Sequence, residues 1–423
     1  MKEHIYICID LKSFYASVEC AQRGLDAMTA NLVVADMSRT EKTICLAVTP
    51  AMKALGVRNR CRIFEIPSHI KYIAAVPRMQ LYIDYAAEIY SIYLKYISKD
   101  DIHVYSIDEV FMDVTDYLDM YNLSARQLGQ TIIGEIYDKL KIHAVCGIGS
   151  NLYLAKVALD ITAKHASDFV GELTEESYRQ SLWDHRPLTD FWRIGAGTAK
   201  RLASYGILTM RDIAQADEDF LYHLFGIDAE LLIDHAWGRE PVTIADIKSY
   251  KPGFNCLSSG QVLPFDYPFE DGRLIVKEMM DLLCLDLVAK QLVTKSITLY
   301  VGYSNRLNVP SAHGSVSLDD ETNSDLLLIP AVASLYEKIV NPHYTIKRVN
   351  ISCNHVVPEE YHQYSFFTDA EELAKNRRMQ EAVISIKNKF GKNAILKGMN
   401  LEEHATTRER NTQIGGHRSG KET

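Results

Sequence analysis

Residues 104–115 read V-Y-S-I-D-E-V-F-M-D-V-T, and two neighbouring carboxylates, Asp108 and Glu109, stand in the middle of this stretch. The β-forming residues on either side predict short strands over 102–107 and 110–115. Side chains along a strand alternate between its two faces, so both acids reach one site only where a strand ends or turns. Because Asp is common in turns, the pair taken alone also fits an ordinary turn.

A third carboxylate, Asp10, ends a similar run near the N-terminus, I-Y-I-C-I-D over residues 5–10. The alternation predicts that Cys8 and Asp10 share one face of this strand, with Ile7 and Ile9 on the other. Hard divalent cations need clustered oxygen ligands, and Mg²⁺ on a phosphate substrate is usually held by one or two carboxylates. Three carboxylates delivered by two strands suit a pair of metal ions that activate one oxygen and stabilise another.

Five sequence elements, in order along nearly the whole chain, resemble those of one enzyme family. The elements D-L-K-S-F-Y-A-S-V-E (10–19) and S-I-D-E (106–109) resemble the palm motifs of Y-family DNA polymerases, the translesion enzymes. The fingers helix of that family is matched by A-M-K-A-L-G-V (51–57) and its palm helix by G-I-G-S-N-L-Y-L-A-K-V-A-L-D-I-T-A-K (147–164). The helix-hairpin-helix of the thumb is matched by I-G-A-G-T-A-K-R-L (194–202). Five matches in order make the resemblance specific.

The fingers motif and the long C-terminal part are most similar to the UmuC-like (ImpB/MucB/SamB) branch of this family. D-M-S-R-T-E-K-T-I-C-L-A-V at residues 36–48 is most similar to UmuC homologues of Gram-positive bacteria and their mobile elements.

The resemblance implies a multi-domain right-hand polymerase that combines α/β and α+β domains. Its parts would be a ferredoxin-like α/β palm, small fingers, a helical thumb with a helix-hairpin-helix, and a C-terminal α+β little finger. We expect the palm at 1–25 and 79–185, the fingers at 26–78, the thumb at 186–246, the little finger at 247–360, a clamp-binding peptide at 361–369, and a basic helix and flexible tail at 370–423.

Bulk properties agree with a soluble protein of several domains. The chain has 423 residues, 47% of them hydrophobic and 24% charged, which is too long for one core and ordinary in composition. No apolar run approaches the roughly 18 residues of a membrane span, and the N-terminus leads straight into a strand, so we expect neither a membrane partner nor a signal peptide. Eight scattered cysteines without a C-x-x-C pair predict reduced thiols in a cytoplasmic protein, without zinc or disulfides.

The net charge of −9 is unusual for a protein that binds nucleic acid, so basic charge must be local. Seven Lys or Arg stand against one acidic residue between Lys375 and Lys397, and basic residues also outnumber acids from Arg186 to Arg211. We expect DNA binding that is weak without a partner and strongly dependent on salt. The basic helix and tail have two interpretations: a solvated face, or a second contact with DNA or a partner such as a recombinase filament or a UmuD-like protein.

By resemblance, Asp10, Asp108 and Glu109 are the catalytic residues and hold two Mg²⁺ ions, with the Leu11 carbonyl as a main-chain ligand. One metal would lower the pKa of the primer 3′-OH and the other would hold the triphosphate. In the transition state of phosphoryl transfer, negative charge is spread over the phosphate oxygens, and the enzyme has to neutralise that charge. It does not need to form a covalent intermediate. Accordingly, no Ser-His-Asp or Cys-His nucleophile is expected.

The resemblance also implies a nucleotide site. Tyr15 matches the steric gate, a ring that leaves no room for a ribose 2′-OH, and Phe14 would support it. Lys164 and Lys53 match the basic residues that reach the triphosphate from the palm and the fingers. The plainer alternatives are core packing for the two rings and solvated surface charge for the two lysines.

Three positions depart from the family pattern. Pro50 stands where many members carry a tyrosine, and the family's K-P-N-G after the palm helix reads K-H-A-S from residue 164. Lys12 stands where Asp or Asn is more usual. We expect one phosphate contact to be missing and the charge of Lys12 to perturb the metal site, with the chemistry itself unchanged.

Two further segments would bind macromolecules. In the thumb motif, Gly195 and Gly197 form a turn before a helix that carries Lys200 and Arg201, and such a turn can meet a DNA phosphate through backbone N–H groups. The turn without its context would be a weak indication.

The second segment is a short peptide near the C-terminus. Gln363, Phe366 and Phe367 resemble the Q-x-x-[LF]-F peptide by which bacterial polymerases dock on the sliding clamp. The alternative for the two phenylalanines is that they cap the core of the preceding domain.

The favoured interpretation is a DNA-directed DNA polymerase of the translesion type, a nucleotidyltransferase that uses dNTPs and primer-template DNA in damage bypass, DNA repair and the SOS response. The alternative is a catalytically silent regulator that binds the clamp and DNA on a polymerase scaffold. Loss of any one of Asp10, Asp108 or Glu109 would favour it, and all three are present. A nucleotide cyclase on a similar palm is disfavoured by the DNA-gripping C-terminal half.

Overall fold

The two carboxylate-bearing runs of the sequence are neighbouring strands of one sheet, which we call the central sheet. β1 is antiparallel to β6 on one side and to β7 on the other, and Asp10 faces Glu109 across the β1–β6 pair. The strand order is β5-β6-β1-β7-β8. The strands are β5 (Ile102–Val104), β6 (Glu109–Asp113), β1 (Tyr6–Leu11), β7 (Ala144–Gly149) and β8 (Val170–Leu173).

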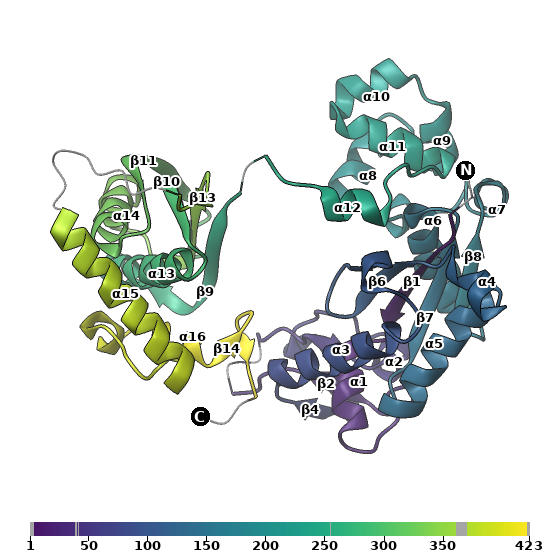
Figure 1. The fold of residues 1–423 in the computed structure, drawn as a ribbon, viewed down its shortest axis with the longest axis horizontal. Coiled ribbons are helices and arrows are strands. Elements are labelled where there is room, and N and C mark those ends of the chain that lie inside the picture. The colour runs from purple at the N-terminus through teal and green to yellow at the C-terminus, as the bar shows by residue number, and fades with distance from the viewer. Residues whose placement is uncertain (1–3, 39, 41, 254, 361–369, 421–423) are drawn as a thin grey trace. The chain divides into compact units, whose positions relative to one another are not determined.

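The computed structural model describes residues 4–38, 40, 42–253, 255–360 and 370–420. The chain divides into two units, residues 1–250 and 251–423 (Figure 1). Both units combine helices with sheets, which confirms the mixed α/β and α+β content predicted from the sequence. No helix in the described part is long and apolar enough to cross a membrane.

Helices cover both faces of the central sheet. α5 (Ala125–Leu140) lies against the face that carries Ile7, because a Cβ at Gly129 would touch Ile7 and Cys146. α6 (Leu152–Val157) lies against the opposite face, where it packs with Cys8 in one buried cluster. The predicted alternation of β1 is therefore confirmed, and it places Asp10 on the α6 side.

Glycine allows α6 to approach the sheet closely. A Cβ at Gly147 of β7 would lie 2.1 Å from the Ala155 carbonyl oxygen, a distance that no side chain tolerates. After α6 the chain continues through a π-helical turn over Ala158–Thr162 and a 3₁₀ turn over Ala163–His165. The predicted palm helix is thus helical to its end, although not as one regular α-helix.

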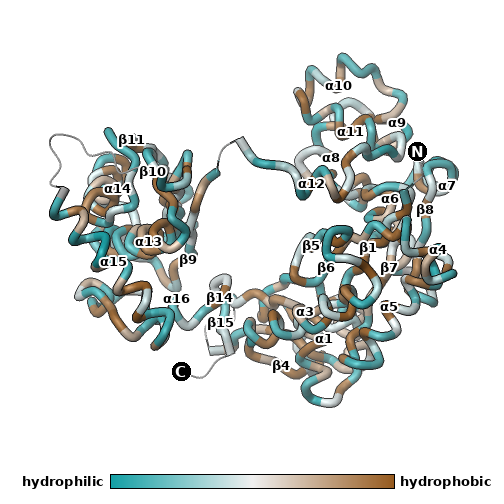
Figure 2. The backbone as a smooth tube through the Cα atoms, viewed as in Figure 1, coloured by the Kyte–Doolittle hydropathy of each residue, from teal (hydrophilic) through white to brown (hydrophobic). Residues whose placement is uncertain are grey.

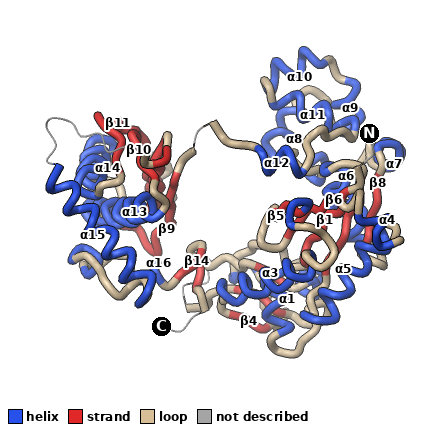
Figure 3. The backbone as a smooth tube through the Cα atoms, in the orientation of Figure 1, coloured by secondary structure: helices blue, strands red, loops and turns tan. Residues whose placement is uncertain are grey.

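The remaining elements of the first unit surround this sheet. A three-stranded sheet in the order β3-β2-β4 has its own small core, and the helices after residue 190 are short (Figure 3). The elements are α1 (Phe14–Ala21), β2 (Leu32–Val34), β3 (Ala47–Val48), α2 (Pro50–Ala54), β4 (Ile73–Ala75), α3 (Met79–Tyr93), α4 (Tyr117–Tyr121), α7 (Glu175–Ser181), α8 (Ala196–Ala203), α9 (Met210–Gln215), α10 (Glu218–Phe225), α11 (Asp228–Trp237) and α12 (Ile244–Ser249).

The polar, Pro- and Gly-containing stretch over residues 246–256, whose composition is typical of a linker, begins within a helix. α12 continues to Ser249, and Lys248 at its end donates hydrogen bonds to the Lys99 and Asp100 carbonyls. The hydroxyl of Thr243 caps the start of this helix. Such an N-cap residue is the local indication of a helix within this polar stretch.

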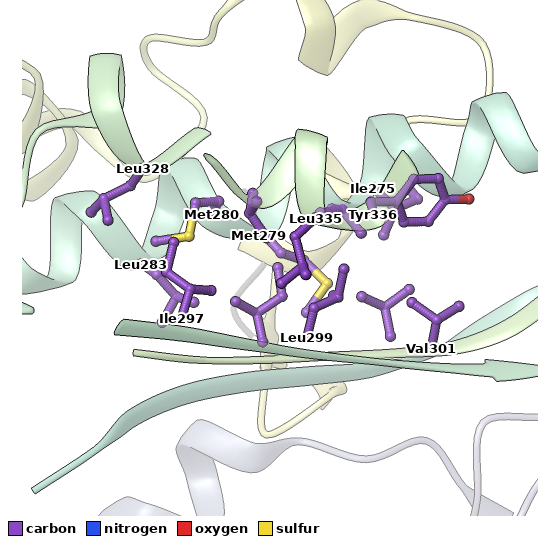
Figure 4. Close-up of a cluster of buried hydrophobic side chains, with 14 of the residues drawn as sticks. Ile275, Met279, Met280, Leu283, Ile297, Leu299, Val301, Leu328, Leu335 and Tyr336 are labelled. Carbon is purple, nitrogen blue, oxygen red and sulfur yellow. The ribbon is translucent and has the colours of Figure 1, made fainter. Parts of the chain in front are cut away.

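The second unit is a sheet with two helices on one face. Its strand order is β11-β10-β12-β9, and its helices and strands confirm the α+β content expected for this part of the chain. Apolar side chains from β10, α13 and α14 interdigitate in its core (Figure 4). The elements are β9 (Leu257–Tyr267), α13 (Phe269–Ala289), β10 (Leu292–Tyr303), β11 (Ala312–Thr322), α14 (Asp325–Ile339), β12 (Ile346–Asn354) and β13 (Val357–Pro358).

The C-terminal segment is ordered, so the expectation of a flexible tail within 370–423 is wrong for residues 404–420. The predicted basic helix is α15 (Ala370–Phe390), and hydrophilic residues predominate along it in Figure 2. After it come α16 (Thr407–Asn411), β14 (Gln413–Ile414) and β15 (His417–Arg418). The buried carboxylate of Glu278 in α13 accepts hydrogen bonds from the backbone N–H groups of Thr406 and Thr407, which compensates for the tail's lack of apolar residues.

Candidate active site

The three predicted acidic residues stand at the same end of the central sheet. Asp10 faces Glu109 in the strand register, and the Leu11 N–H donates to the Asp108 carbonyl over 3.0 Å. Residues 105–108 form the turn between β5 and β6, and we call them the catalytic turn. Asp108 belongs to this turn and Glu109 begins β6. The turn thus places Asp108 directly before the start of β6, where Glu109 stands.

Ser106 orients Asp108 within the catalytic turn. Its hydroxyl donates to Oδ1 of Asp108 over 2.6 Å and accepts from the Asp108 N–H over 3.3 Å. The turn itself is closed by the N–H groups of Tyr105 and Ser106, which both donate to the Glu109 carbonyl. The carboxylate of Asp108 is consequently held in place while remaining partly exposed.

Asp10 is the acid whose pKa is raised by burial and by the negative charges of the other two. Burial raises the pKa of Asp10 to about 7, and the negative charges of Asp108 and Glu109 add to the rise. Lys164 and Lys156 oppose it without cancelling it. A cation between the acids would relieve this repulsion, so the donor set fits a hard divalent metal ion such as Mg²⁺.

Glu109 has a close cationic partner that the sequence analysis missed. Nζ of Lys156, on α6, lies 2.8 Å from Oε1 of Glu109, and both side chains are nine-tenths buried. The same ammonium lies 3.1 Å from Asp160, and Cys8 donates its thiol proton to Glu109 over 3.4 Å. The spacing of Lys156, Asp160 and Lys164, four residues apart on a helix, was the available signal.

In the residues that the structure describes, no three His, Cys, Asp or Glu side chains are grouped closely enough to form a metal centre. The contacts of Glu109 account for this, because its carboxylate is turned toward Lys156. The carboxylates of Asp10 and Asp108 remain the pair whose charges repel each other most directly.

Three lysines gather beside the acids. Lys164 lies 2.8 Å from Asp160 and is 43% exposed, so it keeps a free face. Burial lowers the pKa of Lys12, and the charges of Lys53 and Lys164 lower it further. The pKa of Lys53 is lowered by burial too, with Asp10 opposing and Lys164 adding to the shift. These mutual effects indicate one cationic cluster next to Asp10, in which Lys12, the residue expected to perturb the metal site, joins Lys53 and Lys164.

The two predicted aromatic residues differ in their surroundings. Phe14 is 2% exposed, so its ring is part of the core. Tyr15 is only partly buried and stacks on Tyr82 of α3, with ring centroids 4.6 Å apart and an interplanar angle of 18°. Burial raises the pKa of Tyr15, and Asp108 raises it further, which indicates that the phenol lies near the acids.

A buried ion pair supports Tyr82. Its hydroxyl donates to Glu19 over 2.8 Å, and the guanidinium of Arg78 donates to both oxygens of the same carboxylate over 2.9 and 2.7 Å. Glu19 is fully buried and also pairs with Arg23. Arg23 lies four residues after Glu19, but no sequence pattern links Glu19 to Arg78 and Tyr82, which lie 59 and 63 positions away from it.

The glycine turn of the predicted hairpin stands where the sequence analysis expects it. Gly195 is the N-cap of α8, and a Cβ at Gly195 or Gly197 would meet no atom within 4 Å, so the turn is open. Lys200 and Arg201 lie in the last turn of α8, with the Arg201 guanidinium 5.3 Å from the ring centre of Phe225.

The predicted clamp peptide, with Gln363, Phe366 and Phe367, lies outside the described residues. The basic helix that follows is partly neutralised, because Arg377 pairs with Glu359 and Glu381. Lys397, beyond that helix, pairs with Asp281 and Asp325.

Comparison with protein families gives two matches. Residues 9–160 match the impB/mucB/samB family, and residues 257–366 match the C-terminal domain of the same family. Together the two models cover more than half of the chain and include every candidate residue of the carboxylate and lysine sites except Lys164.

Known relatives are similar over nearly the full length. UvrX of Bacillus subtilis (strain 168), whose name refers to UV-damage repair, is 27% identical over 98% of this chain and 97% of its own length. DNA polymerase IV 2 of Halalkalibacterium halodurans is 27% identical over 98% of this chain and 99% of its own length. Among solved structures, a Y-family DNA polymerase chimera has the same fold, with a TM-score of 0.63 and 18% identity, covering 84% of this chain and 99% of that chain.

Proposed function

Because this chain belongs to the impB/mucB/samB family of UmuC-like Y-family DNA polymerases, we propose that it extends a primer 3′-end with deoxynucleotides opposite damaged or undamaged template. The observation that carries the proposal is that the strand register places Asp10, Asp108 and Glu109 at one end of the central sheet. Their mutual repulsion is the condition that a bound divalent cation relieves.

Asp10, Asp108, Glu109 and the Leu11 carbonyl would hold two Mg²⁺ ions. When bound, these ions make the primer 3′-OH more acidic and neutralise charge on the triphosphate and the leaving pyrophosphate. Asp10 and Asp108 supply the anionic charge for this site, and Ser106 keeps the carboxylate of Asp108 in one orientation. The carboxylate of Glu109, which contacts Lys156, would turn from that ammonium toward the metal site to act as a ligand.

The cationic cluster would bind the triphosphate. Lys53 and Lys164 take the role that the resemblance implies, and Lys12 offers the same chemistry beside them. An ammonium group donates to phosphate oxygens and neutralises charge without covalent chemistry, which is what loose phosphoryl transfer needs. Lys12 thereby replaces the phosphate contact that the K-H-A-S sequence leaves out.

Tyr15 would select deoxyribose. Its ring is stacked on Tyr82 and is not free to swing aside, so a ribose 2′-OH above it would meet a rigid surface. Phe14 would act from the core by holding the start of α1.

The remaining parts would grip DNA and recruit partners. We keep the expected division into palm, fingers, thumb and little finger, in which the turn at Gly195 and Gly197, with Lys200 and Arg201, meets the primer-template backbone. The peptide with Gln363, Phe366 and Phe367 would dock on the sliding clamp. A recombinase filament and a UmuD-like protein would be further partners in the cytoplasm, during the response to DNA damage.

Primer extension tests the proposal. Purified protein is supplied with primed template, Mg²⁺ and dNTPs, with and without clamp, beside the Asp108→Ala, Glu109→Ala double variant. We expect extension by the wild type alone. Absence of extension by both proteins, even with clamp and recombinase filament, would favour the silent scaffold. Equal extension by both would trace the activity to a contaminant.

A further inference from the structure

Tyr105, the first residue of the catalytic turn, contacts a tryptophan 87 positions later in the chain. Nε1 of Trp192 donates a hydrogen bond to the Tyr105 hydroxyl over 3.2 Å. The two rings meet edge to face, with centroids 5.9 Å apart. A tryptophan that combines a directed hydrogen bond with ring contact holds its partner in one orientation.

Trp192 also reaches the strand on the other side of the turn. Its ring centroid lies 6.0 Å from that of Phe111 in β6, and Phe111 lies 5.7 Å from Tyr105. Phe111 is 2% exposed, so this end of the contact is anchored in the core. Trp192 therefore touches the chain before Asp108 and the chain after Glu109.

The backbone of the turn links these contacts to the acids. The Tyr105 N–H donates to the Glu109 carbonyl, and the Asp108 carbonyl accepts from Leu11. A shift of the Tyr105 backbone would thus disturb the hydrogen bond that closes the turn between Tyr105 and Glu109.

On its other side, Trp192 belongs to the helical region that carries the hairpin. It stands three residues before Gly195, the N-cap of α8. Its ring lies parallel to that of His235 in α11, at 6.1 Å and 20°, and His235 is 3.0 Å from Glu240. Trp192 is thereby held by the same helices that would meet the DNA.

We propose that Trp192 is a positioning residue through which DNA bound at the hairpin of residues 194–202 orders the catalytic turn and its carboxylates for metal binding. The inference rests on the proposed function for the identity of the DNA. It requires that DNA and metal favour the same arrangement of the turn, so that each tightens the binding of the other.

Two single variants remove the hydrogen bond and keep an aromatic ring at each position: Trp192→Phe and Tyr105→Phe. The matched control is Trp183→Phe, because the Trp183 indole donates over 2.7 Å to the Ala236 carbonyl within the helical region. A Trp192→Phe, Tyr105→Phe double variant completes a cycle that isolates the shared hydrogen bond.

The first readout is the binding of Mn²⁺, measured by the electron paramagnetic resonance signal of free Mn²⁺, with and without primer-template DNA. In the wild type, DNA is expected to tighten Mn²⁺ binding. In each single variant, the factor by which DNA tightens Mn²⁺ binding should be roughly three- to tenfold smaller than in the wild type, which corresponds to the loss of one hydrogen bond. The double variant should lose no more than either single variant, and Trp183→Phe should behave as the wild type.

The second readout is steady-state extension. In both single variants kcat should fall and the Mg²⁺ concentration for half-maximal rate should rise. The KM for dNTP at saturating Mg²⁺ and the Kd for DNA measured without a divalent metal should stay within about twofold of the wild type. A merely structural role would lower the thermal midpoint without moving the Mg²⁺ dependence.

Three outcomes would overturn the inference: no tightening of Mn²⁺ binding by DNA in the wild type, full tightening in the single variants, or an equal loss in Trp183→Phe. Failure of the proposed function is a separate result. If the wild type does not extend primers but the variants still lose the tightening, the polymerase assignment fails and the coupling stands.

Discussion

Tyr15 lies nearly flat on Tyr82, with ring centroids 4.6 Å apart. The hydroxyl of Tyr82 donates to Glu19, a fully buried carboxylate held on both oxygens by Arg78. The ring assigned to sugar selection thus rests on a second ring, and that ring is fixed by a buried ion pair. Because the Tyr15 ring is supported in this way, it cannot easily move away from a ribose 2′-OH. A small steric clash between the two therefore costs binding free energy.

The first prediction concerns the choice between dNTP and rNTP. Tyr15→Ala should reduce the ratio of kcat/KM for dNTP over rNTP by roughly 10- to 200-fold, the range for one small group in a tight pocket. Tyr15→Phe keeps the ring and should keep the ratio, so it serves as the control. Single-nucleotide incorporation with matched dNTP and rNTP measures both. A ratio unchanged in Tyr15→Ala would remove Tyr15 from sugar selection.

The second prediction concerns the ion pair beneath Tyr82. Glu19→Gln keeps the shape and removes the charge, so the free energy of unfolding should fall by about 3 kcal/mol, as when one partner of a buried pair is lost. Burial alone would raise the pKa of Glu19, but hydrogen bonds from Arg78, Arg23 and Tyr82 outweigh it and lower the pKa.

The pH dependence of this difference follows from the lowered pKa of Glu19. The stability contributed by its charge is complete above the pKa of an unfolded Glu, about 4.3, and is lost as the pH falls through the lower folded-state pKa. Urea unfolding of wild type and Glu19→Gln should therefore differ most at pH 6–8 and converge in acid. A difference that grows on acidification would contradict the assignment.

Much of the fold and of the candidate site could be predicted from the sequence, because it depends on residues that are close to one another in the chain. The alternation of β1 placed Asp10 on the face of Cys8, and the acid pair at 108 and 109 required a turn. The helices on either side of Gly195 and the strand–helix–strand order of the second unit also follow from periodicity and turn residues.

The parts that were missed depend on contacts between distant residues. Lys156 and Glu109 are 47 positions apart by number, and Tyr82 and Glu19 are 63 apart. The polar composition of residues 404–420 predicted a flexible tail, which is wrong. The segment is held by hydrogen bonds to Glu278, a buried carboxylate on α13. Composition shows only how much apolar surface a segment can bury by itself. It does not show that a buried charge elsewhere in the chain needs the segment's N–H groups as hydrogen-bond donors.

The third prediction concerns Mg²⁺ and stability. Mg²⁺ should raise the thermal midpoint of the wild type, since a ligand at 100 times its Kd adds about 2.7 kcal/mol to the folded state. The Asp10→Asn, Asp108→Asn double variant should show no such rise, and in EDTA it should be more stable than the wild type because the repulsion is gone. Differential scanning fluorimetry measures both, and an equal Mg²⁺ response in the two proteins would place the ion elsewhere.

The fourth prediction concerns Lys12. Lys12→Asn restores the residue type more usual in the family and should raise KM for dNTP roughly tenfold by removing one charged hydrogen bond to phosphate. Lys139→Ala is the control, because Lys139 pairs with Glu135 on the surface of α5 and lies on another element. If Lys12 instead perturbs the metal site, Lys12→Asn would raise kcat and leave KM unchanged.

The last prediction concerns the C-terminal segment. Glu278 is 1% exposed and accepts from the Asn400 amide over 2.8 Å and from the Thr406 N–H over 2.7 Å. Glu278→Gln turns one acceptor into a donor that faces these donors, so docking should weaken by about 1–3 kcal/mol. The segment 391–420 should then become the first site cut by protease, while the core of α13 stays protected.

Limited proteolysis followed by intact mass measures this change. Glu381→Gln is the matched control, since Glu381 lies on α15 with a side chain 56% exposed and pairs with Arg377 at the surface. The control should be cut like the wild type, because an exposed ion pair contributes at most about 1 kcal/mol. Equal protection of the segment in Glu278→Gln would mean that Lys397, through Asp281 and Asp325, holds it instead.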